Sequence, residues 1–332
     1  MRRVIIILLC CLLAGGCSAL PAEERSFAVA LGLSVREGVW EAAARIPSYQ
    51  QSGGYLTLQA RGGSLEEAMA GLDASAPMRM HYGQLRLLIF SGELARSGSF
   101  VSAVEAVADR AETRLQAQLC VTEDPMKGVM DALEPQTGAR LSKSLDVMLE
   151  TRREMGVIPD ASLSGILRMG QRQDPVLIRI SLEDEKTLRL TGGEMISGAA
   201  GAQGSLSAEE MQLLSLMQGK VRRTMITLED GTVTIHDAGC RLSLDGNRAC
   251  VRLKVRCSGS SLTAEGAADA LQREVRGVIG RLAEAGCDAL GLGRFAIRHF
   301  RDAAAWRELD WRHVYPALEW EILVDVQTAA QA

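Results

Sequence analysis

The chain is poor in aromatic residues and histidine, and it carries no recognisable catalytic motif. Phe, Trp and Tyr make up 4% of its 332 residues, and only four histidines occur. Neither the G-x-S-x-G turn of a serine hydrolase nor the H-E-x-x-H helix of a zinc protease is present. The histidines are scattered and form no constellation with a nucleophile; they are His81, His236, His299 and His313. The sequence therefore nominates no catalytic residue, and we expect a protein that is not an enzyme.

The chain also lacks an excess of charge of either sign. It has 37 basic and 41 acidic residues, which give a formal net charge of −4, and the two signs are interspersed. Domains that bind nucleic acid usually cluster their lysine and arginine on one face. Interspersed charge therefore predicts no basic face and no nucleic-acid partner. No polybasic segment that would reinforce membrane contact stands beside the N-terminal region.

The cysteines indicate neither a disulfide framework nor a zinc site. Beyond Cys17 their number is odd and their spacing irregular, so they cannot all pair: Cys120, Cys240, Cys250, Cys257 and Cys287. His236 lies near three of them in sequence, but the paired spacing of structural zinc ligands is missing. Cys250 and Cys257 would point to opposite faces of one strand and could not share an ion. We expect core thiols and no metal; the disulfide state stays open.

What the chain does contain is an N-terminal export signal. Met1-Arg2-Arg3 is a short positive head, and residues 4–13 form an uninterrupted apolar run. Ten apolar residues are too few to span a bilayer, which needs about 20. Small residues then lead to Cys17, an order that is typical of a signal peptide. The run resembles a bacterial lipobox, so we expect removal of residues 1–16 and lipidation of Cys17. An ordinary secretory signal with a chance cysteine is the alternative.

The remaining chain predicts a multi-domain α+β protein in which mostly antiparallel sheets pack against helices. Residues 17–124 interleave strands with helices and suggest an N-terminal α/β domain. One of these helices begins at a Ser64–Glu67 capping box, and another is expected from Phe100 to about Thr113. Residues 125–183 are expected to form a helix-rich middle domain. Residues 184–328 resume the pattern and predict a C-terminal α+β domain.

Strands dominate the expected C-terminal domain. Residues 188–196 suggest a hairpin that turns at Thr191-Gly192-Gly193, and a second capping box at Ser207–Glu210 predicts a helix. Four strands are expected between residues 221 and 257, two of them joined by a short link at 237–239. Alternating apolar residues at 318–326 predict a final strand with one buried face.

A long helix and a glycine-rich segment stand between these strands. Residues 264–285 carry one apolar stripe, and Gly286 is expected to end this helix in the left-handed conformation. The segment from Gly291 to Ala296 matches the dinucleotide-binding pattern, but that pattern requires a preceding strand rather than a helix. We therefore expect a turn there and no cofactor. Trp311 could anchor a partner, since exposed Trp is frequent at interaction hot spots; packing in the core is the favoured alternative.

Four short motifs follow the lipobox in a particular order. They are Ala60-Arg-Gly-Gly-Ser64-Leu-Glu-Glu67-Ala68, His81-Tyr-Gly83-Gln-Leu-Arg-Leu-Leu-Ile-Phe90, Ala285-Gly286-Cys-Asp288-Ala-Leu290-Gly291-Leu-Gly293 and Asp310-Trp311-Arg-His-Val-Tyr-Pro316-Ala-Leu-Glu319. In this order, and over nearly the whole mature chain, the sequence resembles the Ger(x)C family, the lipoprotein C subunits of spore nutrient-germinant receptors. It departs from the family at Ser18-Ala19, where Trp-Asp is frequent, at Gln84, where the family has histidine, and at Ala289, where it has proline. These departures suggest a divergent paralogue.

The resemblance implies a non-enzymatic subunit of a membrane complex that is required for nutrient-triggered spore germination. Its partners would be integral-membrane A and B subunits. Its lipid would hold it on the outer face of the cell membrane or of the spore inner membrane. Whether this subunit binds the nutrient itself stays open. A surface-anchored solute-binding or hydrolytic lipoprotein is the alternative, and it predicts a deep ligand cleft between two lobes.

Overall fold

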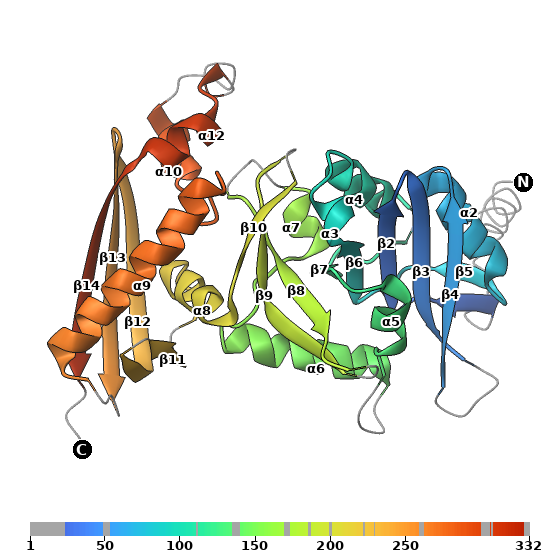
Figure 1. Ribbon diagram of the computed structural model, residues 1–332, viewed down its shortest axis with the longest axis horizontal. Helices are drawn as coiled ribbons and strands as arrows, with labels where there is room; N and C mark the ends of the chain where they lie inside the picture. The colour runs from blue at the N-terminus through green and yellow to red at the C-terminus, as the bar shows by residue number, and fades with distance from the viewer. Residues whose placement is uncertain are drawn as a thin grey trace, which may run out of the picture.

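Two sheets and the helices packed against them organise the computed structural model, which is elongated (Figure 1). The structure describes residues 24–48, 54–110, 112–134, 140–168, 173–184, 187–198, 201–221, 223–228, 230–258, 262–299, 306 and 308–328. The expected signal peptide and Cys17 lie outside these residues. Within the described part of the chain, no helix is both long and apolar enough to cross a membrane.

The larger sheet is mixed and has the strand order β10-β9-β8-β7-β6-β2-β3-β4. Its middle strands β8, β7, β6 and β2 are parallel, and antiparallel strands flank them on both sides. Strands buried on both faces read as continuous apolar runs, as β6 does. The strands are β2 (Ala30–Arg36), β3 (Val39–Pro47), β4 (Tyr55–Gly62), β6 (Leu87–Ser91), β7 (Gln118–Thr122), β8 (Val176–Leu182), β9 (Leu188–Ile196) and β10 (Ala202–Leu206).

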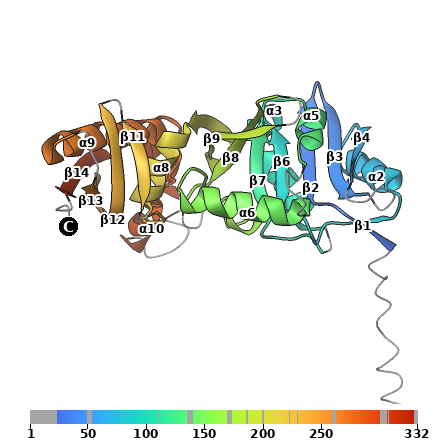
Figure 2. The ribbon, with the colours of Figure 1, turned by 90° about the horizontal axis from the view of Figure 1, so that it is seen from below.

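Short helices and a small two-stranded sheet complete this lobe. They are α2 (Leu65–Ser75), α3 (Gly92–Ala95), α4 (Phe100–Ala108), α5 (Met126–Asp131), α6 (Leu141–Glu154), α7 (Leu163–Ile166), and the parallel strands β1 (Arg25–Phe27) and β5 (Arg79–His81). Helix α6 runs crosswise to the strands of the larger sheet (Figures 1 and 2). Gly32 in β2 has no side chain, and a Cβ there would collide with the Met126 side chain. Helix α5 therefore packs directly onto the strand.

The larger sheet runs across both of the domain boundaries expected at residues 124 and 183. Strands β8, β9 and β10 continue the sheet that β2 to β7 begin, and α5, α6 and α7 contribute to the same hydrophobic core. A connection between two parallel strands needs a crossover, usually a helix. Residues 123–175, which include α5, α6 and α7, form that crossover from β7 to β8. Among the described residues it has no core of its own.

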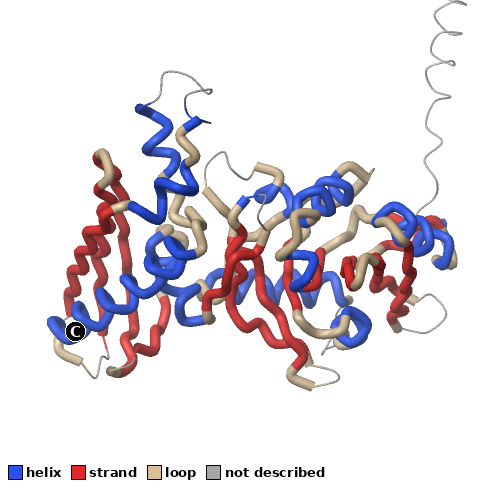
Figure 3. The backbone as a smooth tube through the Cα atoms, turned by 45° about the horizontal axis from the view of Figure 1, so that its top comes forward, coloured by secondary structure: helices blue, strands red, loops and turns tan. Residues whose placement is uncertain are grey.

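The smaller sheet forms the C-terminal lobe and has the order β11-β12-β13-β14. Helix α9 packs along it, and helix α8 packs between the two sheets (Figures 1 and 3). A second hydrophobic core lies beneath α9. The elements are α8 (Ala208–Met217), β11 (Thr224–Leu228), β12 (Gly231–Asp245), β13 (Arg248–Ser258), α9 (Ala264–Glu284), α10 (Gly293–Ala296), η3 (Ile297–His299), α12 (Trp311–Val314), η4 (Tyr315–Ala317) and β14 (Glu319–Thr328).

Two expected turns and one helix end are wrong. Residues 188–196 form one strand, β9, because Gly192 adopts φ +129° at a bulge and lets the Leu206 carbonyl approach, where a Cβ would collide. Residues 237–239 are not a link, because β12 continues through them with a bulge after Ile235. The helix expected to reach Thr113 ends at Ala108, and the Thr113 hydroxyl donates to the Val107 carbonyl in the turn that follows.

The capping boxes are confirmed to different degrees. Ser207 Oγ accepts a hydrogen bond from the Glu210 amide at 3.2 Å, and Glu210 Oε2 accepts one from the Ser207 amide at 2.8 Å. That box is complete. Ser64 Oγ likewise accepts from the Glu67 amide, but the Glu67 carboxylate accepts from the amide of Gly63 instead of Ser64. In the Ser64–Glu67 box, the bond from the glutamate is therefore displaced by one residue.

Candidate functional site

The loop that follows α9 joins the two lobes and contains one of the sequence motifs. It begins with a left-handed glycine, Gly286, at φ +59°. The Gly286 amide donates to the Ala283 carbonyl, and the Cys287 amide donates to the Leu282 carbonyl, both at 2.9 Å. This pair of bonds is a Schellman cap, and it confirms the predicted helix end.

Asp288 lies at the centre of this loop and is 4% exposed. Its Oδ1 accepts the Leu292 amide at 2.8 Å, and its Oδ2 accepts the Gly293 amide at 2.7 Å. The indole Nε1 of Trp311 also donates to Oδ2, at 3.0 Å. A Cβ on Gly293 would lie 3.1 Å from that indole nitrogen, so glycine permits the close approach. The glycine-rich amides that a dinucleotide pattern would offer to phosphate are thus used by the protein's own carboxylate.

Bonds from Asp174 and Ser197 of the larger lobe, and from Gln218 of the C-terminal lobe, hold the same loop. The Asp288 amide donates to Asp174 Oδ2 at 2.9 Å, and the Asp174 amide donates to the Asp288 carbonyl at 3.1 Å. Ser197, just after β9, donates from Oγ to the Gly286 carbonyl. Gln218, just after α8, donates from Nε2 to the Ala289 carbonyl. We call the group Asp174, Asp288, Gly293 and Trp311 the Asp288 junction.

Burial governs the electrostatics of the junction. It raises the pKa of Asp288 to about 6, against the lowering effect of the hydrogen bonds that the carboxylate accepts. Burial also raises the pKa of Asp174, which the Asp288 amide and Arg312 partly offset. The pKa of the neighbouring Cys287 thiol is raised well above its usual value for the same reason, so this thiol stays protonated and unreactive. The Asp288 junction is therefore a buried contact between the lobes that contains two carboxyl groups, Asp174 and Asp288.

The structure places Trp311 in an aromatic cluster beside the junction. Its ring centroid lies 5.7 Å from that of Trp306 and 6.1 Å from that of Tyr315. The side chain is half-buried, and its polar atom is bonded to Asp288. The packing alternative thus describes the observed contacts. A role of Trp311 as a partner anchor stays a prediction for the exposed part of the ring.

Among the residues that the structure describes, the cysteines and histidines do not gather at one place. The five described cysteines have free thiols; Cys120, Cys257 and Cys287 are buried, and Cys240 and Cys250 are partly buried. His81 accepts from the Gly83 amide through Nδ1 and pairs with Glu112 through Nε2. In the described part of the chain, no three side chains of His, Cys, Asp or Glu are grouped so that they could hold a metal ion.

A charged cleft lies where the parallel strands β2, β6 and β7 end. A cavity of ≈ 830 Å³ there is joined through Glu123 and Asp124 to a second of ≈ 720 Å³. Sheets with parallel strands commonly bind ligands at these carboxyl ends. Arg96 forms two bonds to the Glu123 carboxylate, at 2.6 and 3.1 Å, and holds the pKa of Glu123 below its usual value. Glu194 faces the second cavity, and burial raises its pKa.

The grooves differ from the two-lobe cleft expected of a solute-binding protein. Where the lobes meet, a groove of ≈ 410 Å³ is lined by Pro159, Asp174 and Lys220 among others. This groove has half the volume of the charged cleft at the carboxyl ends of β2, β6 and β7.

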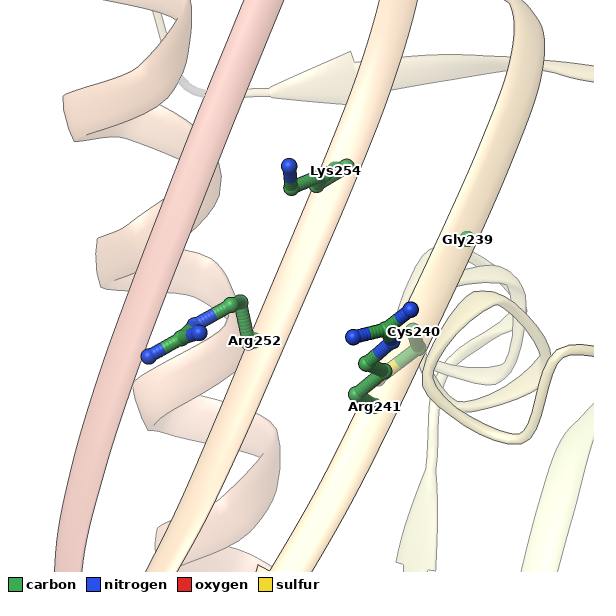
Figure 4. A pocket seen from close by; sticks show the side chains of 5 residues that line it. All are labelled: Gly239, Cys240, Arg241, Arg252 and Lys254. Atoms are coloured by element: carbon green, nitrogen blue, oxygen red, sulfur yellow. The ribbon is translucent and has the colours of Figure 1, made fainter.

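One surface contradicts the expectation that the chain has no basic face. Arg241, Arg252 and Lys254 project together from the exposed face of the smaller sheet (Figure 4). The sequence signal for this surface is an alternation, in which Arg252, Lys254 and Arg256 occupy every second position of β13. Overall composition conceals it, because net charge averages over all faces of the molecule.

Fold and junction together define a two-lobed α+β protein whose lobes share a buried acidic joint. Comparisons with known proteins place it further. A family model described as "Spore germination protein N-terminal domain" matches residues 19–182, and one described as "Spore germination B3/ GerAC like, C-terminal" matches residues 192–329. These matches cover most of the chain, which therefore belongs to the GerAC-like family of spore germination proteins. The resemblance to the Ger(x)C family is confirmed.

A solved structure agrees with this assignment. The chain is similar to the protein in "Crystal Structure of the GerBC protein", with a TM-score of 0.57 over 90% of this chain and 97% of that chain. Sequence identity is 12%, so this likeness shows the fold alone. A search of curated proteins gave no match.

Proposed function

We propose that the protein is a lipid-anchored, non-enzymatic C subunit of a germinant receptor that is required for nutrient-triggered spore germination. The observation that carries this proposal is the order of the two family matches, which follow each other along the chain with only nine residues between them. The proposed partners are integral-membrane A and B subunits. The proposed location is the outer face of the cell membrane or of the spore inner membrane.

The anchor in this proposal is Cys17. Residues 1–16 carry the charge, apolar length and small residues of an export signal, and the thiol follows directly. Acyl chains contribute about 0.8 kcal/mol per buried methylene, and two or more chains are needed for stable attachment. Seven residues, 18–24, separate this cysteine from β1, so the eight residue steps from Cys17 to Arg25 can span at most about 29 Å.

The test combines Cys17→Ser with two matched controls in the same leader, Cys10→Ala and Cys11→Ala. The full chain is expressed in sporulating cells, labelled with an alkyne fatty acid, and fractionated. We expect Cys17→Ser to lose the label, leave the membrane fraction and abolish the germination response to nutrients. The two control variants should keep all three properties, because their thiols lie in the removed segment.

Nutrient-independent triggers give the second control. A spore that lacks this subunit should still germinate when it is triggered without nutrients. Normal nutrient germination after gene deletion, in a strain with no second copy of this gene type, would refute the proposed function. Retained label on Cys17→Ser would refute the anchor.

The alternative function, a surface-anchored solute-binding or hydrolytic lipoprotein, is supported by the charged cleft next to Arg96 and Glu123. It predicts saturable binding or turnover of a small solute by the full chain in detergent. Loss of that activity in Arg96→Gln, with nutrient germination intact, would favour the alternative.

A further inference from the structure

The exposed face of the smaller sheet carries a row-by-row pattern of charge. Helix α9 covers the other face, and no helix lies over this one in the view of Figure 4. Residues directly opposite each other on neighbouring strands point to the same face. Strand register therefore sorts the face into five rows across β12, β13 and β14, which are Asp245–Arg248–Glu319, Ser243–Cys250–Glu321, Arg241–Arg252–Leu323, Gly239–Lys254–Asp325 and Asp237–Arg256–Gln327.

Positive charge is concentrated in the rows of Arg252 and Lys254. These two rows hold three cations and one carboxylate, whereas the other three hold two cations and four carboxylates. Arg241 lies directly opposite Arg252. Like charges in that relation destabilise a sheet, so folding stability does not account for the pair. None of the three cations forms an ion pair or a side-chain hydrogen bond with a residue that the structure describes.

These cations surround a hollow of ≈ 340 Å³, which we call the cation pocket. Its lining contains no carboxylate and consists of Gly239, Cys240, Arg241, Arg252 and Lys254. Figure 4 shows the three cationic side chains in front of β12 and β13, with α9 behind the sheet. The space in front of Gly239 is open, because a Cβ at that position would have no atom within 4 Å. The pocket thus offers both positive charge and room to an incoming anion.

We propose that the cation pocket binds an acidic segment of a partner protein. Arginine presents a planar fork that matches a carboxylate, and Arg252 has Leu323, which is 39% exposed, beside it in the same row. Arginine next to exposed apolar surface is the composition of a protein interface. A flat anionic membrane would also meet the four carboxylates of the outer rows. A narrow peptide segment can contact the two middle rows without approaching those four carboxylates. Charge complementarity therefore favours a protein segment over a membrane as the partner.

The most direct test changes the net charge of the cation pocket without removing any of its three cations. Gly239→Glu places a carboxylate among the three cations, and Gly239→Gln adds the same bulk without charge. The full-length lipoprotein in detergent is titrated against a fluorescent octaglutamate peptide at about 50 mM salt, where surface charges act over longer distances. We expect Gly239→Glu to weaken peptide binding at least tenfold, and Gly239→Gln to change it less than twofold.

Removing cations gives a second arm. Arg252→Gln should weaken peptide binding about fivefold, whereas Arg248→Gln, on the same strand and face but in an acidic row, should change it less than twofold. Equal weakening by both variants would overturn the proposal, because it would show diffuse attraction rather than a site. Absence of peptide binding to the unsubstituted protein would also overturn it.

The same variants distinguish other sources of anion. If Gly239→Glu weakens binding to phosphatidylglycerol vesicles and leaves peptide binding unchanged, the occupant is a membrane and the proposal is wrong. It is wrong also if inorganic phosphate at about 10 mM displaces the peptide and itself binds in a manner that depends on Arg252. That the partner belongs to a germinant receptor rests on the proposed function. Germination that is unaffected by gene deletion would refute that function alone, because the peptide titration does not depend on it.

Discussion

Replacing Asp288 with alanine tests the role of the junction most directly. The change leaves the amides of Leu292 and Gly293 and the Trp311 indole without their acceptor. An unpaired buried donor costs about 1–3 kcal/mol, and the half-buried indole should cost least. The change also relieves the burial of a carboxylate whose pKa is raised to about 6. That relief is worth about 3 kcal/mol above pH 6, since one pKa unit corresponds to 1.36 kcal/mol. We therefore expect a net loss of about 3 kcal/mol at pH 7.5.

The pH dependence of this loss has a definite sign. The pKa of Asp288 is higher in the folded protein, about 6, than the ordinary value of 3.8. Between these two values the folded state binds more protons, so wild-type stability falls as pH rises from about 4 to about 6. The alanine variant lacks this contribution. Its deficit relative to the wild type should therefore be larger at pH 5 than at pH 7.5, by about 1 kcal/mol.

Urea unfolding at both pH values measures these quantities. Asp269→Ala, which removes an exposed carboxylate from α9, is the matched control and should change stability by less than about 0.5 kcal/mol at either pH. Thermal unfolding of Asp288→Ala should begin about 5 °C lower than that of the wild type. A deficit that grows between pH 5 and pH 7.5 would refute the reasoning, because it would mean that the loop stabilises the ionised carboxylate more than burial penalises it.

Three further predictions concern other parts of the structure. Arg45→Met should lower the free energy of unfolding by about 2 kcal/mol in urea titration, because the 4% exposed guanidinium bonds to Thr57, Glu134 and the Leu133 carbonyl; an unchanged midpoint would contradict this. Ser207→Ala should cost about 1 kcal/mol by the same assay, since it removes one half of a complete capping box. Arg241→Gln should stabilise the free protein by a few tenths of a kcal/mol at low salt and by nothing at 1 M salt, as relief of like charge requires.

Local features of the fold could be predicted from the sequence because their causes lie within a few residues. Ser207 and Glu210 satisfy each other's backbone groups at a helix start, and Gly286 adopts a backbone conformation that other residues avoid. Strand and helix patterns at 264–285 and 318–326 follow from which side chains must be buried. None of these predictions needed knowledge of distant contacts.

Features that depend on distant contacts could not be predicted in this way. The pairing of β7 with β8 joins residues more than 50 positions apart, so the crossover between them has the sequence pattern of a helical domain. The bend of β9 at Gly192 depends on the approach of β10, and without that neighbour a glycine pair indicates a turn. Sequence periodicity describes how an element is buried but not which element buries it.

The candidate sites also combine local features, which the sequence predicts, with features that depend on distant contacts. The motif around Asp288 was recognisable, but the use of its amides by its own carboxylate required the fold. The cation pocket depends on the register that brings Arg241 opposite Arg252. Each of these residues alone is an ordinary exposed arginine on a strand. They lie together on one face because of how β12 pairs with β13, and counting charges along the chain does not reveal this pairing.

The lipid anchor determines how tightly the cation pocket must bind its partner for the contact to be occupied. Exposed cations contribute little individually, since exposed ion pairs are worth about 0–1 kcal/mol, so a pocket with three of them binds weakly. A lipid that confines the protein to the plane of its partners raises their effective concentration to about the millimolar range, and weak contacts are then occupied. A protein without the lipid, at about 1 μM in solution, meets its partners at a concentration roughly a thousandfold lower than the anchored protein. Tenfold overexpression of Cys17→Ser should therefore leave nutrient germination defective even with an intact pocket. Full recovery on overexpression would mean that the contact is strong without the anchor.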